Sequence, residues 1–190
     1  MPIVVDAERR RREVGAVVAN IIATQGLEAV TIRSVAAAAG FSTAVVSHYF
    51  SDKRDLLLYS YRIAQDHAYR RLDEAARQSP GNLERIIDVL LPCHEEARRD
   101  WLVWTVFWAL AISDAEFSEV QREQFQRAQQ RIAQLLRRVH PSLRAPAVQL
   151  KARTLLSGLL GLALQASFDR EAWPPEVQRR ALRELLRPPG

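Results

Sequence analysis

Apolar residues recur along this chain with a period near 3.6 residues, and no long stretch alternates with a period of two. One stripe at positions i, i+3, i+4, i+7 and i+8 begins at Val14, and a second begins at Leu83. Side chains with that spacing share one face of an α-helix, whereas a half-buried strand requires alternation. The sequence therefore predicts an all-α fold.

Capping residues, glycines and prolines divide the chain into about nine helices. Thr31 and Ser42 are good N-caps, and Gly26 and Gly40 stand where helices commonly end. Pro92 is expected to kink the helix that begins at Leu83. The other expected helices cover residues 8–25, 32–39, 43–49, 53–78, 101–112, 114–140 and 147–169, with a last one from Pro174 or Pro175 to before Pro188.

Composition narrows the class of protein. One cysteine among 190 residues excludes an intrachain disulfide framework and a Cys-rich zinc module. The first apolar stretch is too short for a signal peptide, and no apolar run approaches the roughly 20 residues of a membrane span. We therefore expect a soluble, cytoplasmic protein. The net charge of +5 hints at an anionic partner, although residues 1–55 carry seven basic and six acidic side chains.

Two short capped helices meet at Ala39-Gly40-Phe41, a tight turn typical of a helix-turn-helix. Val45 and Val46 would give the second helix a narrow apolar face, with polar residues pointing outward. That exposed set suits a helix presented to the DNA major groove. A helical hairpin that packs a core explains the caps equally well, so the residues alone leave both interpretations open.

The stretches T-I-R-S-V-A-x-x-A-G-F-S and V-S-H-Y-F-x-D-K-x-D-L resemble the TetR family of one-component transcriptional regulators over residues 8–60. Ala44 stands where glycine is frequent and Ser47 where tyrosine is usual, which should alter base choice without breaking the fold. The resemblance implies a three-helix DNA-binding domain at residues 1–52. It implies a helical ligand-binding and dimerisation domain at residues 53–190.

The resemblance also implies which side chains contact double-stranded DNA. Residues at the start of the second helix and at the end of the motif would hold phosphates, namely Thr31, Arg33, Tyr49 and Lys53. Those on the outer face of the recognition helix would meet base edges, namely Thr43, Ala44, Ser47 and His48.

Enzymatic chemistry has little support in the sequence. The four histidines are far apart, none follows a glutamate by three residues, and HExxH, Walker A and GxGxxG motifs are absent. Cys93, His94, Glu95 and Glu96 are adjacent and do not share a helix face. We therefore expect no catalytic residues, no metal and no cofactor.

Residues 101–112 hold Trp101, Trp104 and Trp108 on one helix face, with Phe107 beside it. Aromatic stripes at helical spacing usually belong to a core. In the TetR family, however, this helix lines the inducer pocket, and the segment resembles the choline-sensing BetI-type subgroup. Trp104, Phe107 and Trp108 are thus candidate ligand contacts, for a choline-like amine or for a hydrophobic aromatic compound.

Leucines are spread widely around the helix at 147–169, which suggests a second apolar face for a partner protomer. Small residues four apart would let a partner helix approach closely. The expected dimer contacts are Leu156, Ser157, Leu160, Gly161, Leu164 and Leu182.

These features together predict a homodimeric repressor that binds a pseudo-palindromic operator and is released by a small-molecule inducer. An activator or a ligand-independent regulator is the alternative within the same class. A helical small-molecule-binding protein without DNA function is the alternative from a different class.

Overall fold

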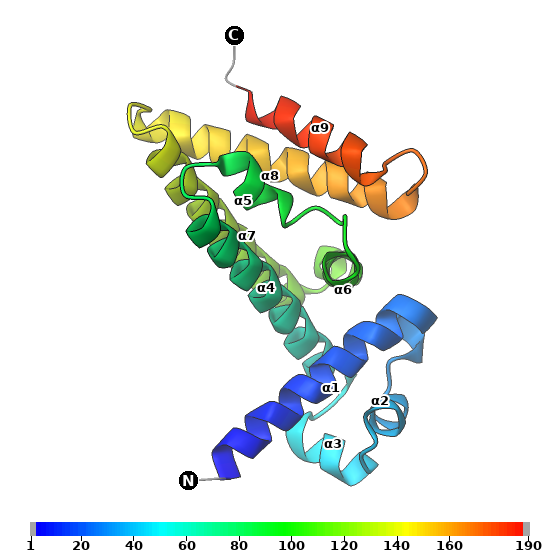
Figure 1. Cartoon of the computed structure of the whole chain (residues 1–190). Helices are drawn as coiled ribbons and strands as arrows, with labels where there is room; N and C mark the ends of the chain where they lie inside the picture. The colour runs from blue at the N-terminus through cyan, green and yellow to red at the C-terminus, as the bar shows by residue number, and fades with distance from the viewer. Residues whose placement is uncertain (1–2, 188–190) are drawn as a thin grey trace.

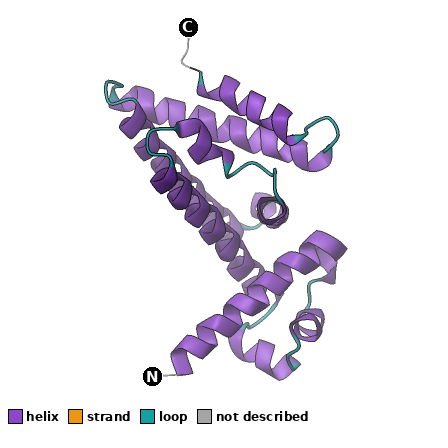
Figure 2. Ribbon diagram, in the orientation of Figure 1, coloured by secondary structure: helices purple, strands orange, loops and turns teal. Residues whose placement is uncertain are grey.

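The computed structural model describes residues 3–187, and that part of the chain is entirely helical (Figures 1 and 2). It contains nine α-helices and one 3₁₀ turn, which confirms the predicted fold class. The elements are α1 (Ile3–Gln25), η1 (Leu27–Ala29), α2 (Ile32–Ala39), α3 (Thr43–Tyr49), α4 (Lys53–Gln78), α5 (Leu83–Asp88), α6 (Glu95–Ser113), α7 (Ala115–Val139), α8 (Ala145–Phe168) and α9 (Pro175–Leu186).

The helix-turn-helix is fixed by local hydrogen bonds. The Thr31 hydroxyl accepts the N–H of Ser34, whose own hydroxyl accepts the N–H of Thr31, so both free donors at the start of α2 are satisfied. Gly40 ends α2 in the left-handed conformation with φ 70°. Ser42 then caps α3 by accepting the N–H of Val45. The predicted bounds of both helices are confirmed.

The first three helices pack together at one end of the molecule (Figure 1), and their apolar residues are part of one hydrophobic core that continues through the rest of the described chain. Val14 and Val18 from α1, Val46 from α3 and Phe50 just beyond it are all buried and belong to the hydrophobic core. Helix α4 then leaves this unit and packs against both α1 and α6. It therefore connects the helix-turn-helix with the rest of the chain.

The C-terminal helices form a bundle in which α6 packs against both α4 and α7 and α7 packs on α8. Helix α9 lies against α8 at the end of the molecule far from α2 and α3 (Figure 1). Helix α8 is long and apolar enough to cross a membrane by length and composition. Eight of its residues are nevertheless buried within the protein, and the core helix of a soluble protein passes the same test.

The segment around Pro92 differs from the prediction. Helix α5 ends at Asp88, so Pro92 lies in a turn and kinks nothing. Helix α6 begins at Glu95, six residues before the aromatic stretch, because His94 accepts the N–H of Ala97 as its N-cap. Histidine is not among the usual capping residues, and the polar first turn hides the apolar period.

Candidate DNA interface and ligand cavity

The outer face of α3 carries the four side chains predicted to meet bases. Thr43, Ala44, Ser47 and His48 are exposed, while Val46 is fully buried beneath them. The structure therefore brings these four residues together on one accessible surface at the end of the molecule. A helix presented in this way has the geometry needed to enter a major groove.

The four predicted phosphate contacts flank this surface. Thr31 and Arg33 are exposed at the start of α2, where α-helices present free N–H groups. Tyr49 is half-buried and packs edge-on against the ring of His48 at 5.0 Å. Lys53 opens α4, and its ammonium lies 3.9 Å from a carboxylate oxygen of the exposed Glu28. That solvated pair is weak and would exchange readily for a phosphate.

Phe50 fixes the position of α3 against the neighbouring helices. Its ring is buried and packs edge-on against Tyr59 of α4 at 5.3 Å. The Arg11 guanidinium from α1 covers both rings, at 5.2 Å from Phe50 and 4.8 Å from Tyr59. Arg12 pairs instead with Glu8 on the surface of α1. Within the basic run at the N-terminus, Arg11 thus packs against the fold, and sequence reasoning missed this role.

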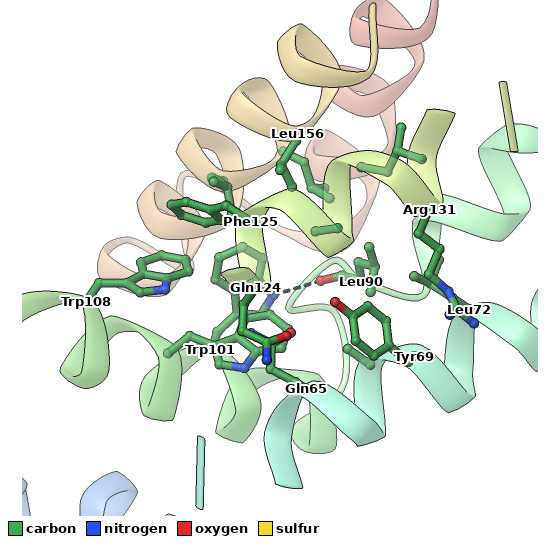
Figure 3. Close-up of a pocket in the computed structure, with 16 residues that line it drawn as sticks. Gln65, Tyr69, Leu72, Leu90, Trp101, Trp108, Gln124, Phe125, Arg131 and Leu156 are labelled. Carbon is green, nitrogen blue, oxygen red and sulfur yellow. Dashed lines mark hydrogen bonds between the residues drawn. The ribbon is translucent and has the colours of Figure 1, made fainter. Parts of the chain in front are cut away.

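A cavity lies between α4, α6, α7 and α8, in the middle of the C-terminal bundle (Figure 3). Its empty volume is about 590 Å³ and includes space open to solvent. Aromatic side chains form much of its wall. They are Tyr69, Trp101, Trp104, Trp108 and Phe125, and the close-up shows Trp108 and Phe125 toward one end with Tyr69 and Arg131 toward the other (Figure 3).

The three tryptophans differ in their partners. Trp101 donates its indole N–H to the Leu90 carbonyl at 2.7 Å, which makes it part of the core as well as of the wall. Trp104 and Trp108, two of the three candidate ligand contacts, also line the cavity. Burial raises the pKa of Tyr69, so its hydroxyl stays protonated at neutral pH.

Phe107 was expected in the same pocket, and the structure corrects that expectation. Its ring stacks on Tyr61 with centroids 3.8 Å apart and meets Phe117 edge-on at 4.9 Å. The residue is not part of the cavity wall. Adjacent helical positions differ by about 100°, so Phe107 points away from Trp108 and packs toward α4 and α7 instead of the cavity.

Comparisons with known proteins agree with both parts of this arrangement. The pattern described as "Bacterial regulatory proteins, tetR family" matches residues 17–59. The pattern described as "BetI-type transcriptional repressor, C-terminal" matches residues 81–187, more than half of the chain. The chain belongs to the TetR family. Its C-terminal domain is of the BetI type, and it is a DNA-binding transcriptional regulator rather than an enzyme.

Individual relatives extend the match along the chain. The BetI regulator of Ectopseudomonas mendocina is 28% identical over 184 residues, which cover 93% of this chain and 91% of that protein. The PksA regulator of Bacillus subtilis is 31% identical over 114 residues, 58% of this chain and 56% of its own length. A regulator from Saccharomonospora viridis, solved in complex with choline, shares the fold with a TM-score of 0.83 and 22% identity. The alignment covers 94% of this chain and 96% of that one.

The dimer contacts predicted for this TetR-family chain fall into two groups. Leu156 and Leu182 are corrected, because both are buried inside the protomer and have no surface to offer a partner. Leu160 is half-buried and also lines the cavity. Ser157 and Gly161 are exposed and Leu164 is half-buried, so these three remain on the outside of α8. The wide spread of leucines reflects a helix packed against several others within one chain.

Two further features escaped sequence reasoning. Gln124 of α7 lines the cavity and is buried, although nothing in the sequence distinguishes it from the other polar residues of that helix. Arg54 reaches across to Asp114 between α6 and α7, a contact between residues sixty positions apart that no local pattern signals. In the described part of the chain, no group of three or more histidine, cysteine or acidic side chains is placed to hold a metal ion.

Proposed function

We propose that this regulator is a cytoplasmic homodimeric repressor that binds a pseudo-palindromic operator and is released when a small molecule occupies the cavity. The observation that carries the proposal is that a single helix, α4, connects the DNA-binding surface with the cavity. Helix α4 begins at Lys53, beside the recognition surface, and further along contributes Tyr69 to the cavity wall. We assign residues 1–52 to DNA binding and residues 53–190 to ligand binding and dimerisation.

DNA contacts follow from the exposed surface described above. Thr43, Ala44, Ser47 and His48 would read base edges, and Thr31, Arg33, Tyr49 and Lys53 would hold the flanking phosphates. Two such surfaces must lie about 34–36 Å apart to occupy successive major grooves on one face of the duplex. A dimer provides that pair.

The outer face of α8 supports dimerisation. Leu150 and Phe168 are 67% and 77% exposed and lie eighteen residues apart, which is five helical turns and therefore the same face. Thr154, Ser157, Gly161 and Gln165 continue that face between them. A face with exposed large apolar residues at both ends and small residues at its centre suits a second copy of α8, with α9 beside it.

Release requires that the ligand favour one position of α4 over another. A ligand shifts such an equilibrium only by its differential affinity for the two states. Helix α6 carries Trp101, Trp104 and Trp108 and packs against both α1 and α4, so a change in its position would reach the DNA-binding helices. The choline bound by the Saccharomonospora viridis protein makes a choline-like amine one candidate. A hydrophobic aromatic compound is the other.

Mobility-shift titrations with DNA from the promoter regions adjoining its gene test DNA binding. We expect operator affinity to fall steeply as the salt concentration rises. Lys53→Ala should weaken binding to all DNA sequences similarly, whereas Ser47→Ala and His48→Ala should change base preference. Unchanged operator affinity in both Lys53→Ala and Tyr49→Phe would contradict the assigned phosphate contacts. An activator would raise transcription in vitro from the bound promoter, and a protein without DNA function would shift no fragment.

A further inference from the structure

The electrostatics of the cavity separate the two ligand classes left open above. Among the described residues that line it, Arg131 is the one charged side chain, and none is an aspartate or glutamate. Arg131 pairs with Asp73, and its guanidinium lies 4.9 Å from the centre of the Tyr69 ring. Asp73 itself is not part of the cavity wall.

A quaternary ammonium would therefore enter a site whose one charged wall residue is an arginine already paired with Asp73, and no carboxylate lines that site. Aromatic faces attract cations, but the ligand must also give up its hydration and approach Arg131. Burying a charge in an apolar site is unfavourable unless an opposite charge compensates it. The wall offers no such compensation.

Polar atoms without partners indicate what the cavity does accept. The indole N–H of Trp104, on a side chain 6% exposed, makes no hydrogen bond. Gln124 is 8% exposed and its side-chain oxygen is also unpartnered, as is the buried hydroxyl of Tyr69. The indole N–H of Trp108, which also lines the cavity, has no partner either. Buried polar groups normally have partners, so four in one cavity wall are unusual. An uncharged ligand that carries a hydrogen-bond acceptor would satisfy the donors of Trp104 and Tyr69.

The remaining wall is apolar and built from flat rings. Trp101 meets Trp104 edge-on at 4.9 Å and Trp108 edge-on at 5.9 Å, while Trp108 and Phe125 lie 6.0 Å apart. Leu156 and Leu160 from α8 close the opposite side. Such surfaces pack best against another planar ring.

We infer that the ligand of this cavity is a flat, uncharged aromatic molecule with a hydrogen-bond acceptor, rather than a quaternary ammonium. This inference rests on the proposed function, because it specifies the ligand class for the same cavity. It also separates this chain from a relative that binds choline.

Three bicyclic probes of nearly the same shape test the inference by calorimetric titration of the full chain at pH 8. Quinoline is uncharged and carries an acceptor nitrogen, naphthalene lacks the acceptor, and N-methylquinolinium carries a positive charge. We expect quinoline to bind about five- to tenfold more tightly than naphthalene, the value of one net hydrogen bond. The affinity for quinoline should exceed the affinities for N-methylquinolinium and for choline by at least about tenfold.

Two variants connect these affinities to named atoms. Trp104→Phe keeps an aromatic ring and removes one of the unpartnered donors, so the preference for quinoline over naphthalene should fall, and adding Tyr69→Phe should reduce it further. Gln124→Glu places a carboxylate in the wall, so the preference should shift toward N-methylquinolinium. Gln134→Glu adds the same charge at an exposed position of α7 and should leave the order unchanged.

Tighter binding of N-methylquinolinium or choline than of quinoline by the parent protein would overturn the inference. Binding of none of the four compounds would overturn it too. The parent protein alone gives both results, so they do not depend on the folding of a variant. Operator binding is measured separately, without any ligand. The titrations therefore test the ligand class alone, and the ligand-free mobility shift tests the proposed DNA function alone.

Discussion

Arg54 and Asp114 form a two-point ion pair that joins the first turn of α4 to the start of α7, with nitrogen–oxygen distances of 2.7 and 2.5 Å. Asp114 is also the N-cap of α7 and accepts the N–H groups of Glu116 and Phe117. Arg54 reaches the Glu116 carboxylate at 2.7 Å and lies 4.4 Å above the ring of Phe117. The residue next to the predicted phosphate contact Lys53 is thus held by the helix that follows the cavity-lining α6.

The first prediction concerns the acid stability of this contact. Hydrogen bonding from Arg54 lowers the pKa of Asp114 from 3.8 to about 2. A carboxylate with a lowered folded-state pKa stabilises the fold above its unfolded pKa and loses that contribution as the pH falls through the folded value. The Asp114→Asn variant should therefore be less stable than the parent at pH 6, with the difference shrinking between about pH 4 and pH 2. Urea unfolding across that range measures it, and a constant difference would contradict the prediction.

The second prediction concerns DNA affinity. Without the ion pair, the first turn of α4 is less firmly fixed, so Arg54→Gln should weaken operator binding about three- to tenfold. Arg122→Gln is the matched control, since it removes a pair with Glu119 that lies within one turn of α7. Equal operator affinity in the parent and both variants would show that the contact does not position the DNA-binding helices.

Helix boundaries could be predicted from the sequence where they depend on residues close together along the chain. The caps Thr31 and Ser42 and the left-handed Gly40 are local, and they predicted α2 and α3 to the residue. The cap His94 uses an unusual residue type, so the start of α6 was misplaced by six positions.

Contacts between distant helices were predicted less well. Hydrophobicity shows that Phe107, Leu156 and Leu182 are buried but not which surface buries them. Phe107 turned out to pack on Tyr61, and Leu156 to line the cavity. Nothing in the sequence distinguishes Arg54 from other surface arginines, because its partner Asp114 lies sixty positions away along the chain.

The third prediction separates two glycines of α8. A Cβ atom at Gly158 would lie 2.5 Å from a Leu185 methyl of α9, whereas one at Gly161 meets nothing within 4 Å. Gly158→Leu should therefore destabilise the protomer by about 1–3 kcal/mol through overpacking. Gly161→Leu should keep the helical circular dichroism spectrum yet disrupt the dimer and operator binding together. Light scattering and mobility shift measure these effects, and a Gly161→Leu dimer of parent affinity would remove α8 from the proposed interface.

The fourth prediction distinguishes core from cavity wall within one aromatic stripe. Trp101→Phe removes the donor to the Leu90 carbonyl and leaves that buried acceptor unsatisfied, so it should cost about 2 kcal/mol of unfolding free energy. Trp104→Phe breaks no hydrogen bond and should cost about 1 kcal/mol or less, because Trp104 lines a cavity that is already present. Chemical denaturation of the two variants, monitored by circular dichroism at equal protein concentration, compares these values. Equal decreases in unfolding free energy would show that Trp104 belongs to the core as Trp101 does. The assignment of this helix to ligand binding would then lose its support.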